Sequence, residues 1–165
     1  MKLKTTDFYS DIQKGKTGEQ IFIDDFLNFL NIQYNDVTGC QKFQIIDSDF
    51  VSKIGVYEIK LNYKDDNKII IEEYTNINPS LSKISLGWFY KSKADILIFI
   101  SKETRVMIMI PFNEKFKKHY ENIKNNFELK RNFISTGRNG NQWQSAYRKI
   151  DLNSISGFYS KYKRK

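Results

Sequence analysis

Cysteine, histidine and proline are scarce in this sequence, whose 165 residues include one cysteine, one histidine and two prolines. The single cysteine, Cys40, excludes a disulfide within the chain and is typical of a reducing compartment, so we expect a cytoplasmic location. The single histidine, His119, argues against a zinc cluster and against a Cys–His nucleophile pair. No apolar run approaches membrane-spanning length and the first ten residues lack a signal-peptide core, so no membrane partner is expected.

Positive charge is concentrated near the C-terminus. Residues 115–165 contain thirteen Lys or Arg and three acids, a net charge of +10, whereas residues 1–114 contain 14 basic and 16 acidic residues, a net charge of −2. This asymmetry favours a polyanionic partner such as nucleic acid, although a merely solvated basic surface is the alternative. No Pro/Gly/Ser-rich linker divides the chain. We therefore expect one domain over 1–165, with a core at 17–110 and a basic extension at 111–165.

Hydrophobic periodicity predicts an α/β fold on a mixed sheet. A helix is expected at 17–32, where Thr17 and Gln20 form a capping-box pattern and Glu19 falls in the first turn. Segments rich in β-branched and aromatic residues predict strands at 39–52, 55–64, 67–76, 95–101, 105–111 and around 147–152. The strands at 95–101 and 105–111 are apolar throughout, which indicates cover on both faces. A short helix or ordered loop is expected at 81–94, and a basic helix at 113–133.

The stretch DSDFVSKIGVYEIKLN, residues 47–62, places charged residues inside two apolar strands. If its hairpin loop lies at 52–55, Asp49 stands opposite Glu58 on one face, with Cβ atoms roughly 4.5–5.5 Å apart. Lys60 follows two residues later and therefore shares that face. The other face carries the apolar residues Tyr57, Ile59 and Leu61.

Two neighbouring carboxylates repel each other unless a proton or a cation lies between them. Mg²⁺ prefers oxygen ligands and completes its shell with water and phosphate oxygens. A nearby lysine can orient water and offset charge that develops on a phosphate. These residue types predict metal-assisted hydrolysis of a phosphodiester. The alternative is a solvent-exposed cross-strand charge cluster without chemistry.

The pattern Asp49-x8-Glu58-x-Lys60, after a helix bearing Glu19, resembles the PD-(D/E)xK nuclease superfamily, which includes Holliday-junction resolvases and small phage or mobile-element endonucleases. The resemblance covers about residues 17–100 and includes IIIEEY followed by GWFYKSKADILIFI. It implies a restriction-endonuclease-like α-β-β-β-α-β core, a mixed central sheet flanked by helices, here with a basic C-terminal helical extension. It also implies that Asp49, Glu58 and the Ile59 carbonyl bind Mg²⁺ or Mn²⁺, with Lys60 as catalytic lysine and Glu19 as an auxiliary acid.

Three features depart from the family pattern. Ser48 replaces the proline of the motif. Asp47 is an alternative to Asp49 as the metal ligand, and Glu72 is a further acid that can join the metal site from a neighbouring strand. Phosphate contacts are expected from basic residues: Lys91, Lys93, Lys117, Lys118, Lys124, Lys130, Arg131, Arg138 and Arg148.

The resulting hypothesis is a Mg²⁺-dependent endonuclease acting on DNA, including branched DNA. A homodimer can form through the aromatic segments 87–90 or 155–162. Two alternatives are a catalytically inactive nucleic-acid-binding module and a phage- or plasmid-encoded protein-interaction factor.

Overall fold

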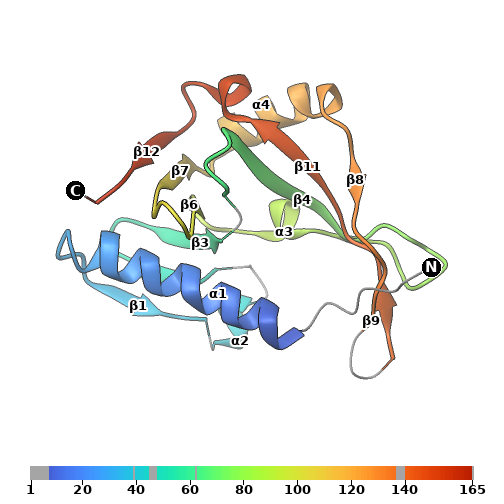
Figure 1. Cartoon of the computed structure of the whole chain (residues 1–165), viewed down its shortest axis with the longest axis horizontal. Coiled ribbons are helices and arrows are strands. Elements are labelled where there is room, and N and C mark those ends of the chain that lie inside the picture. Colours follow the sequence, from blue (N-terminus) through green and yellow to red (C-terminus); the bar gives the residue numbers. More distant parts are fainter. Residues whose placement is uncertain (1–7, 39, 45–47, 62, 137–139, 165) are drawn as a thin grey trace.

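Two β-sheets form the framework of the computed structural model, which describes residues 8–38, 40–44, 48–61, 63–136 and 140–164 (Figure 1). Within these residues, the first sheet has the strand order β1-β2-β3-β6-β7-β12 and the second has the order β5-β4-β11-β8. A separate two-stranded pair, β9 with β10, extends from the second sheet. The α/β class and the mixed sheet agree with the prediction from sequence.

The first sheet combines an antiparallel meander with a parallel crossover. Its strands are β1 (Tyr34–Asp36), β2 (Phe50–Ser52), β3 (Val56–Lys60), β6 (Ile96–Ile100), β7 (Met107–Pro111) and β12 (Ser160–Tyr162). Strands β1, β2 and β3 pair antiparallel, β6 lies parallel to β3, and β7 and β12 continue antiparallel. Leu97, Ile98, Phe99 and Ile100 have no exposed surface. The predicted cover on both faces of β6 is therefore confirmed.

The second sheet contains β4 (Lys68–Asn76), β5 (Ser85–Leu86), β8 (Lys130–Arg131) and β11 (Ala146–Asp151). The strands expected at 39–52, 55–64 and 67–76 imply one continuous sheet. Strand β4 instead pairs with β11 and does not lie beside β3. On β4, Ile69, Ile71 and Glu73 are buried while the intervening residues are partly exposed. This alternation is typical of a strand with only one face against a core.

The N-terminal helix is longer than its sequence pattern predicted. Helix α1 (Phe8–Phe22) continues directly into a π-helical turn, η1 (Ile23–Leu27). Thr17 and Glu19 therefore lie inside a helix, and the predicted capping box and first-turn position are wrong. Gly15, two residues before Thr17, destabilises a helix by about 1 kcal/mol relative to alanine. This cost is too small to end a helix that packs on a sheet, so the helix continues through Gly15.

The remaining helices are short. They are α2 (Gln41–Gln44), which replaces part of the strand expected at 39–52, α3 (Trp88–Lys91), α4 (Glu114–Ile123), and the 3₁₀ turns η2 (Lys124–Asn126) and η3 (Leu152–Ile155). Asn113 caps α4, because its side chain accepts the backbone N–H of Phe116 at 3.0 Å. The predicted basic helix at 113–133 is thus confirmed only in its first half, since the chain becomes extended at Phe127.

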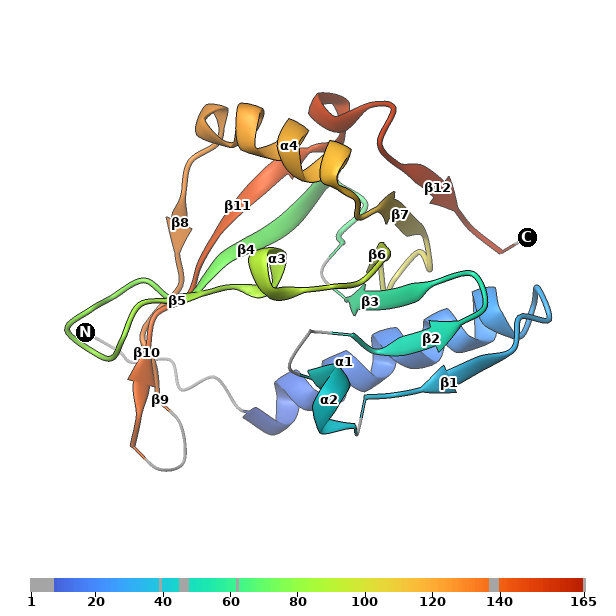
Figure 2. The ribbon, with the colours of Figure 1, turned by 180° about the vertical axis from the view of Figure 1, so that it is seen from behind.

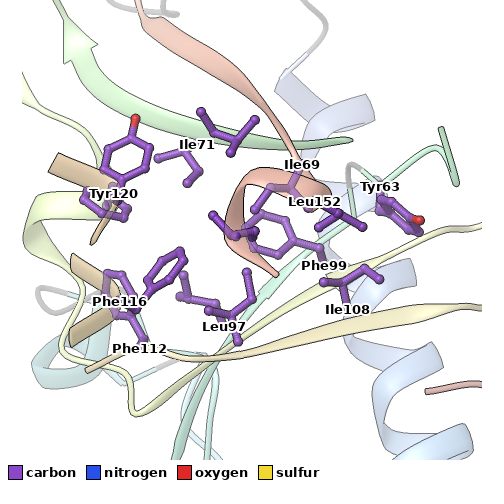
Figure 3. Packing of buried hydrophobic residues seen from close by; sticks show 14 of the residues in the cluster. Tyr63, Ile69, Ile71, Leu97, Phe99, Ile108, Phe112, Phe116, Tyr120 and Leu152 are labelled. Carbon is purple, nitrogen blue, oxygen red and sulfur yellow. The ribbon is translucent and has the colours of Figure 1, made fainter. Parts of the chain in front are cut away.

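Apolar side chains fill both faces of the first sheet, with α1 and α4 on opposite sides (Figures 1 and 2). Under α1, Phe22, Phe50 and Tyr57 are fully buried. On the other face, Leu97, Phe99 and Ile108 point toward Ile69 and Ile71 of β4 and toward Phe116 and Tyr120 of α4 (Figure 3). Trp88 and Phe89 also belong to this core, so of the aromatic residues at 87–90 only Tyr90 is exposed for the predicted dimer contact.

Candidate active site

The hairpin of β2 and β3 has the register expected from its sequence. Phe50 pairs with Tyr57 and Val51 with Val56. Ser52 and Gly55 close the turn by exchanging two backbone hydrogen bonds, 2.9 and 3.2 Å long. The ladder ends at the pair of Phe50 and Tyr57: the Asp49 N–H donates to the Tyr57 carbonyl, so the predicted position of Asp49 opposite Glu58 is not part of the regular register.

Asp49 is held against the backbone of β3. Its Oδ2 accepts the N–H of Ile59 at 2.7 Å, and its own N–H donates to the Tyr57 carbonyl at 2.8 Å. The carboxylate thus takes the place of a backbone acceptor where β2 begins. This arrangement fixes Asp49 directly beside the strand segment that carries Glu58 and Lys60.

Glu58 and Lys60 form a charged pair at the end of β3. Glu58 is 3% exposed, and the Lys60 ammonium donates to its Oε1. The Lys60 Nζ also lies 5.1 Å from the centre of the Trp88 ring, which gives a cation–π contact. The close pairing with Glu58 and the aromatic contact with Trp88 hold the Lys60 ammonium in one position.

Glu72 reaches the same place from the second sheet. Burial raises the pKa of Glu72, while the positive charges of Lys60 and Lys91 and a hydrogen bond from the Trp88 backbone oppose that rise. Gly87 permits the close approach, because a Cβ at this position would lie 2.5 Å from the Glu72 carbonyl oxygen. The sequence named Glu72 as a candidate but gave no signal for Trp88, whose segment was interpreted as surface.

Glu19 approaches from α1. Burial raises the pKa of Glu19, and repulsion from Asp49 and Asp36 raises it further, whereas Lys16 and Lys60 act in the opposite direction. Glu19 therefore lies within electrostatic reach of both Asp49 and Lys60. Sequence reasoning missed Asp36, because β1 is too short to give a strand pattern.

The oxygen donors suit a hard divalent cation. Among the residues that the structure describes, no three Asp, Glu, His or Cys side chains are close enough to hold a metal ion together. An ion on Asp49 and Glu58 would therefore complete its shell with the Ile59 carbonyl, water and phosphate oxygens, as Mg²⁺ commonly does. The alternative ligand Asp47 lies outside the described residues.

Two of the predicted phosphate-binding residues, Arg148 and Lys124, bind carboxylates of the protein itself. The Arg148 side chain is 12% exposed, its Nε donates to Glu73 at 2.9 Å, and it also donates to the Phe127 carbonyl. The prediction that Arg148 binds a phosphate is therefore wrong, because its guanidinium is buried. Lys124 is bound to Glu121 at 2.6 Å, and its side chain is only 23% exposed.

The other predicted basic residues fall into separate groups. Lys91, the last residue of α3, is exposed and lies within electrostatic reach of Glu72. Lys93 is exposed just after α3. On α4, Lys118 is exposed and Lys117 lies 4.5 Å from the Phe112 ring centre. Lys130 and Arg131 are exposed on β8, and Arg138 lies outside the described residues.

Comparison of the chain with protein families, with curated proteins and with solved structures gives no significant match. In the described part of the chain, no helix has both the length and the apolar character needed to cross a membrane. Function must therefore be argued from the side chains at the end of β3.

Proposed function

We propose that this protein is a metal-dependent endonuclease of the PD-(D/E)xK type that hydrolyses phosphodiester bonds in DNA. The observation that carries this proposal is the gathering of acids around Lys60: Asp49, Glu58, Glu19 and Glu72 come from β2, β3, α1 and β4. Four carboxylates around one lysine leave an excess of negative charge, which a divalent cation would neutralise.

The order of the elements supports the proposal. Apart from the short helix α2 between β1 and β2, helix α1, strands β1, β2 and β3, helix α3 and strand β6 have the chain order α-β-β-β-α-β, with β6 parallel to β3. In this interpretation, β1 takes the place of the strand expected at 67–76. Strands β4 and β5 are then an insertion before α3, and β4 brings Glu72 to the site.

Each residue has a distinct role in the proposed reaction. Asp49, Glu58 and the Ile59 carbonyl would hold Mg²⁺ or Mn²⁺, which supplies Lewis acidity and a more acidic bound water. Lys60 offsets the negative charge that develops on the phosphate. The ion pair with Glu58 and the cation–π contact with Trp88 hold the Lys60 ammonium in place, and Glu19 is an auxiliary acid near Asp49.

The test is cleavage of plasmid, linear duplex and four-way-junction DNA with Mg²⁺ or Mn²⁺, and with EDTA as the metal-free control. Lys60→Met should lower the cleavage rate by roughly 10²–10³-fold or more, because it removes a charge that acts on the transition state. The same variant should keep its affinity for DNA. Lys102→Met is the matched control, since Lys102 is an exposed lysine in the turn after β6 and has no role in the proposed site.

Metal binding provides a second readout that does not depend on activity. Mn²⁺ at ten times its dissociation constant should stabilise the parent protein by about 1.4 kcal/mol in thermal unfolding. Glu58→Gln should abolish this stabilisation. The proposal is rejected if no substrate is cleaved with either metal, or if Lys60→Met and Lys102→Met cleave equally well. Binding of DNA without cleavage would instead favour an inactive nucleic-acid-binding module.

A further inference from the structure

A long two-stranded ribbon extends from the second sheet. We define the β ribbon as residues 130–136 and 140–146, which include β8, β9 (Ser135–Thr136), β10 (Gln142–Trp143) and the start of β11. Its two strands pair at Ala146 with Arg131 and again at Gln142 with Thr136. Between these pairs, Asn132 and Ser145 are joined by a backbone hydrogen bond of 2.9 Å and by a side-chain bond of 2.7 Å.

The outer half of the β ribbon projects from the body of the protein. In both Figure 1 and Figure 2, β9 and β10 lie beyond the end of the second sheet, at the opposite end from α4. An isolated two-stranded ribbon is only marginally stable, so a protein gains little stability from it.

The β ribbon contains no acidic residue. Its basic residues are Lys130 and Arg131, and the Lys130 Nζ lies 3.6 Å from a carboxylate oxygen of Glu128, just before the β ribbon. Asn141, Gln142 and Thr136 are exposed, and so are Lys130 and Arg131 at its base. Phe133 is 67% exposed, the largest exposure among the large apolar side chains described. This combination suits a negatively charged partner that offers both hydrogen-bonding and apolar groups.

The base of the β ribbon adjoins the candidate active site. Tyr147, the residue after the β ribbon, pairs with Glu72 across β11 and β4. Glu72 in turn lies within electrostatic reach of Lys60. A nucleic acid with a phosphate at Lys60 would therefore have its neighbouring segment close to the β ribbon.

We propose that the β ribbon enters the major groove of duplex DNA. This inference rests on the proposed function for the position of the DNA, although it concerns binding rather than cleavage. The major groove is about 12 Å wide and admits a two-stranded β-ribbon, and its depth of about 8.5 Å is less than the reach of the strand 140–146, about 20 Å. Asn141 and Gln142 provide amide groups for base edges, and Lys130 and Arg131 provide charges for phosphates.

The test uses isosteric substitutions that add negative charge. The variant Asn141→Asp/Gln142→Glu changes two exposed side chains of the β ribbon, and Asn28→Asp/Gln33→Glu makes the same changes at exposed positions between α1 and β1. Binding to a short DNA duplex is measured in EDTA, where no metal-dependent cleavage occurs. Circular dichroism and thermal unfolding check that both variants are folded.

The ribbon variant should bind duplex DNA roughly tenfold or more weakly, because the new carboxylates lack the amide donors for the base edges and add negative charge inside a groove flanked by phosphates, while the control variant stays within about twofold of the parent. Guanine N7, which lies in the major groove, should be protected by the parent protein from methylation. Equal binding by both variants, protection absent at N7, or tighter binding of double-stranded RNA would overturn the inference.

The two proposals can fail separately. If the parent protein cleaves DNA but the ribbon variant binds normally, the groove assignment is wrong and the nuclease proposal stands. If the parent protein binds duplex DNA through the β ribbon but cleaves nothing with Mg²⁺ or Mn²⁺, the nuclease proposal is wrong and the groove assignment stands.

Discussion

Replacing Arg148 by methionine tests whether this side chain stabilises the interior or contacts a phosphate. Arg148 lies beside Glu73, whose side chain is 3% exposed, and its Nε donates to Glu73 at 2.9 Å. Glu73 also accepts the Tyr120 hydroxyl at 2.6 Å. Methionine has a similar length but no charge, so the substitution would leave the Glu73 carboxylate buried without its cation.

The cost of this substitution follows from the burial of the remaining charge. Removing one partner of a buried ion pair typically costs about 3–5 kcal/mol. The hydrogen bond from Tyr120 to Glu73 remains, so we expect the lower end of this range, about 3 kcal/mol. A native domain is typically stable by about 5–15 kcal/mol, so the variant should still fold. A second substitution, Glu73→Gln in the same protein, should recover part of the loss because no buried charge is then left.

Urea denaturation followed by circular dichroism measures this effect. With an m-value of about 2 kcal/mol/M, a loss of 3 kcal/mol lowers the unfolding midpoint by roughly 1.5 M. DNA affinity of the folded Arg148→Met protein should be unchanged. Arg131→Met is the matched control, since Arg131 is exposed on β8 and should lower DNA affinity without moving the midpoint. A midpoint shift below about 0.5 M together with weaker DNA binding would refute the assignment of Arg148 to the interior.

Three further predictions concern stability. Burial and nearby acids raise the folded-state pKa of Glu19, so its contribution to stability falls as pH rises above the ordinary value of 4.5. Glu19→Gln should therefore raise the thermal unfolding temperature of the metal-free protein at pH 7, and this gain should vanish below pH 4.5. Gly87→Ala should cost about 1–3 kcal/mol in urea denaturation, because the new methyl group meets the backbone of Glu72; an unchanged midpoint would contradict this. Asn113→Ala should cost about 1 kcal/mol by removing the cap at Phe116, whereas Asn113→Asp should retain most of the stability.

Local patterns predicted the hairpin well. The turn at 52–55 and the alternation of apolar and charged residues in β3 set which residues face each other, because a shift by one residue would turn Tyr57 and Ile59 away from the core. The apolar runs of β6 and β7 likewise predicted burial on both faces. In α4, the helical spacing of Phe116 and Tyr120 identified its buried side.

The choice of neighbours for each strand was decided by tertiary structure. Strand β4 has the composition of any half-buried strand, and its sequence contains nothing that favours β11 over β3 as a partner. Strand β1 has only Tyr34 turned inward, so its sequence gives no periodic signal. Pairing between strands distant in sequence depends on how well whole faces pack, which a short pattern does not encode.

The candidate site combines both kinds of information. The sequence alone determined the register of the hairpin and that Glu58 and Lys60 share one face of β3, because turn position and strand alternation are local properties. Only the tertiary structure decided that Trp88 and Glu72 lie beside Lys60 and that Arg148 is buried. A side chain's environment depends on segments far away in the chain, so the same basic residue type can bind a partner when exposed or stabilise the interior when buried.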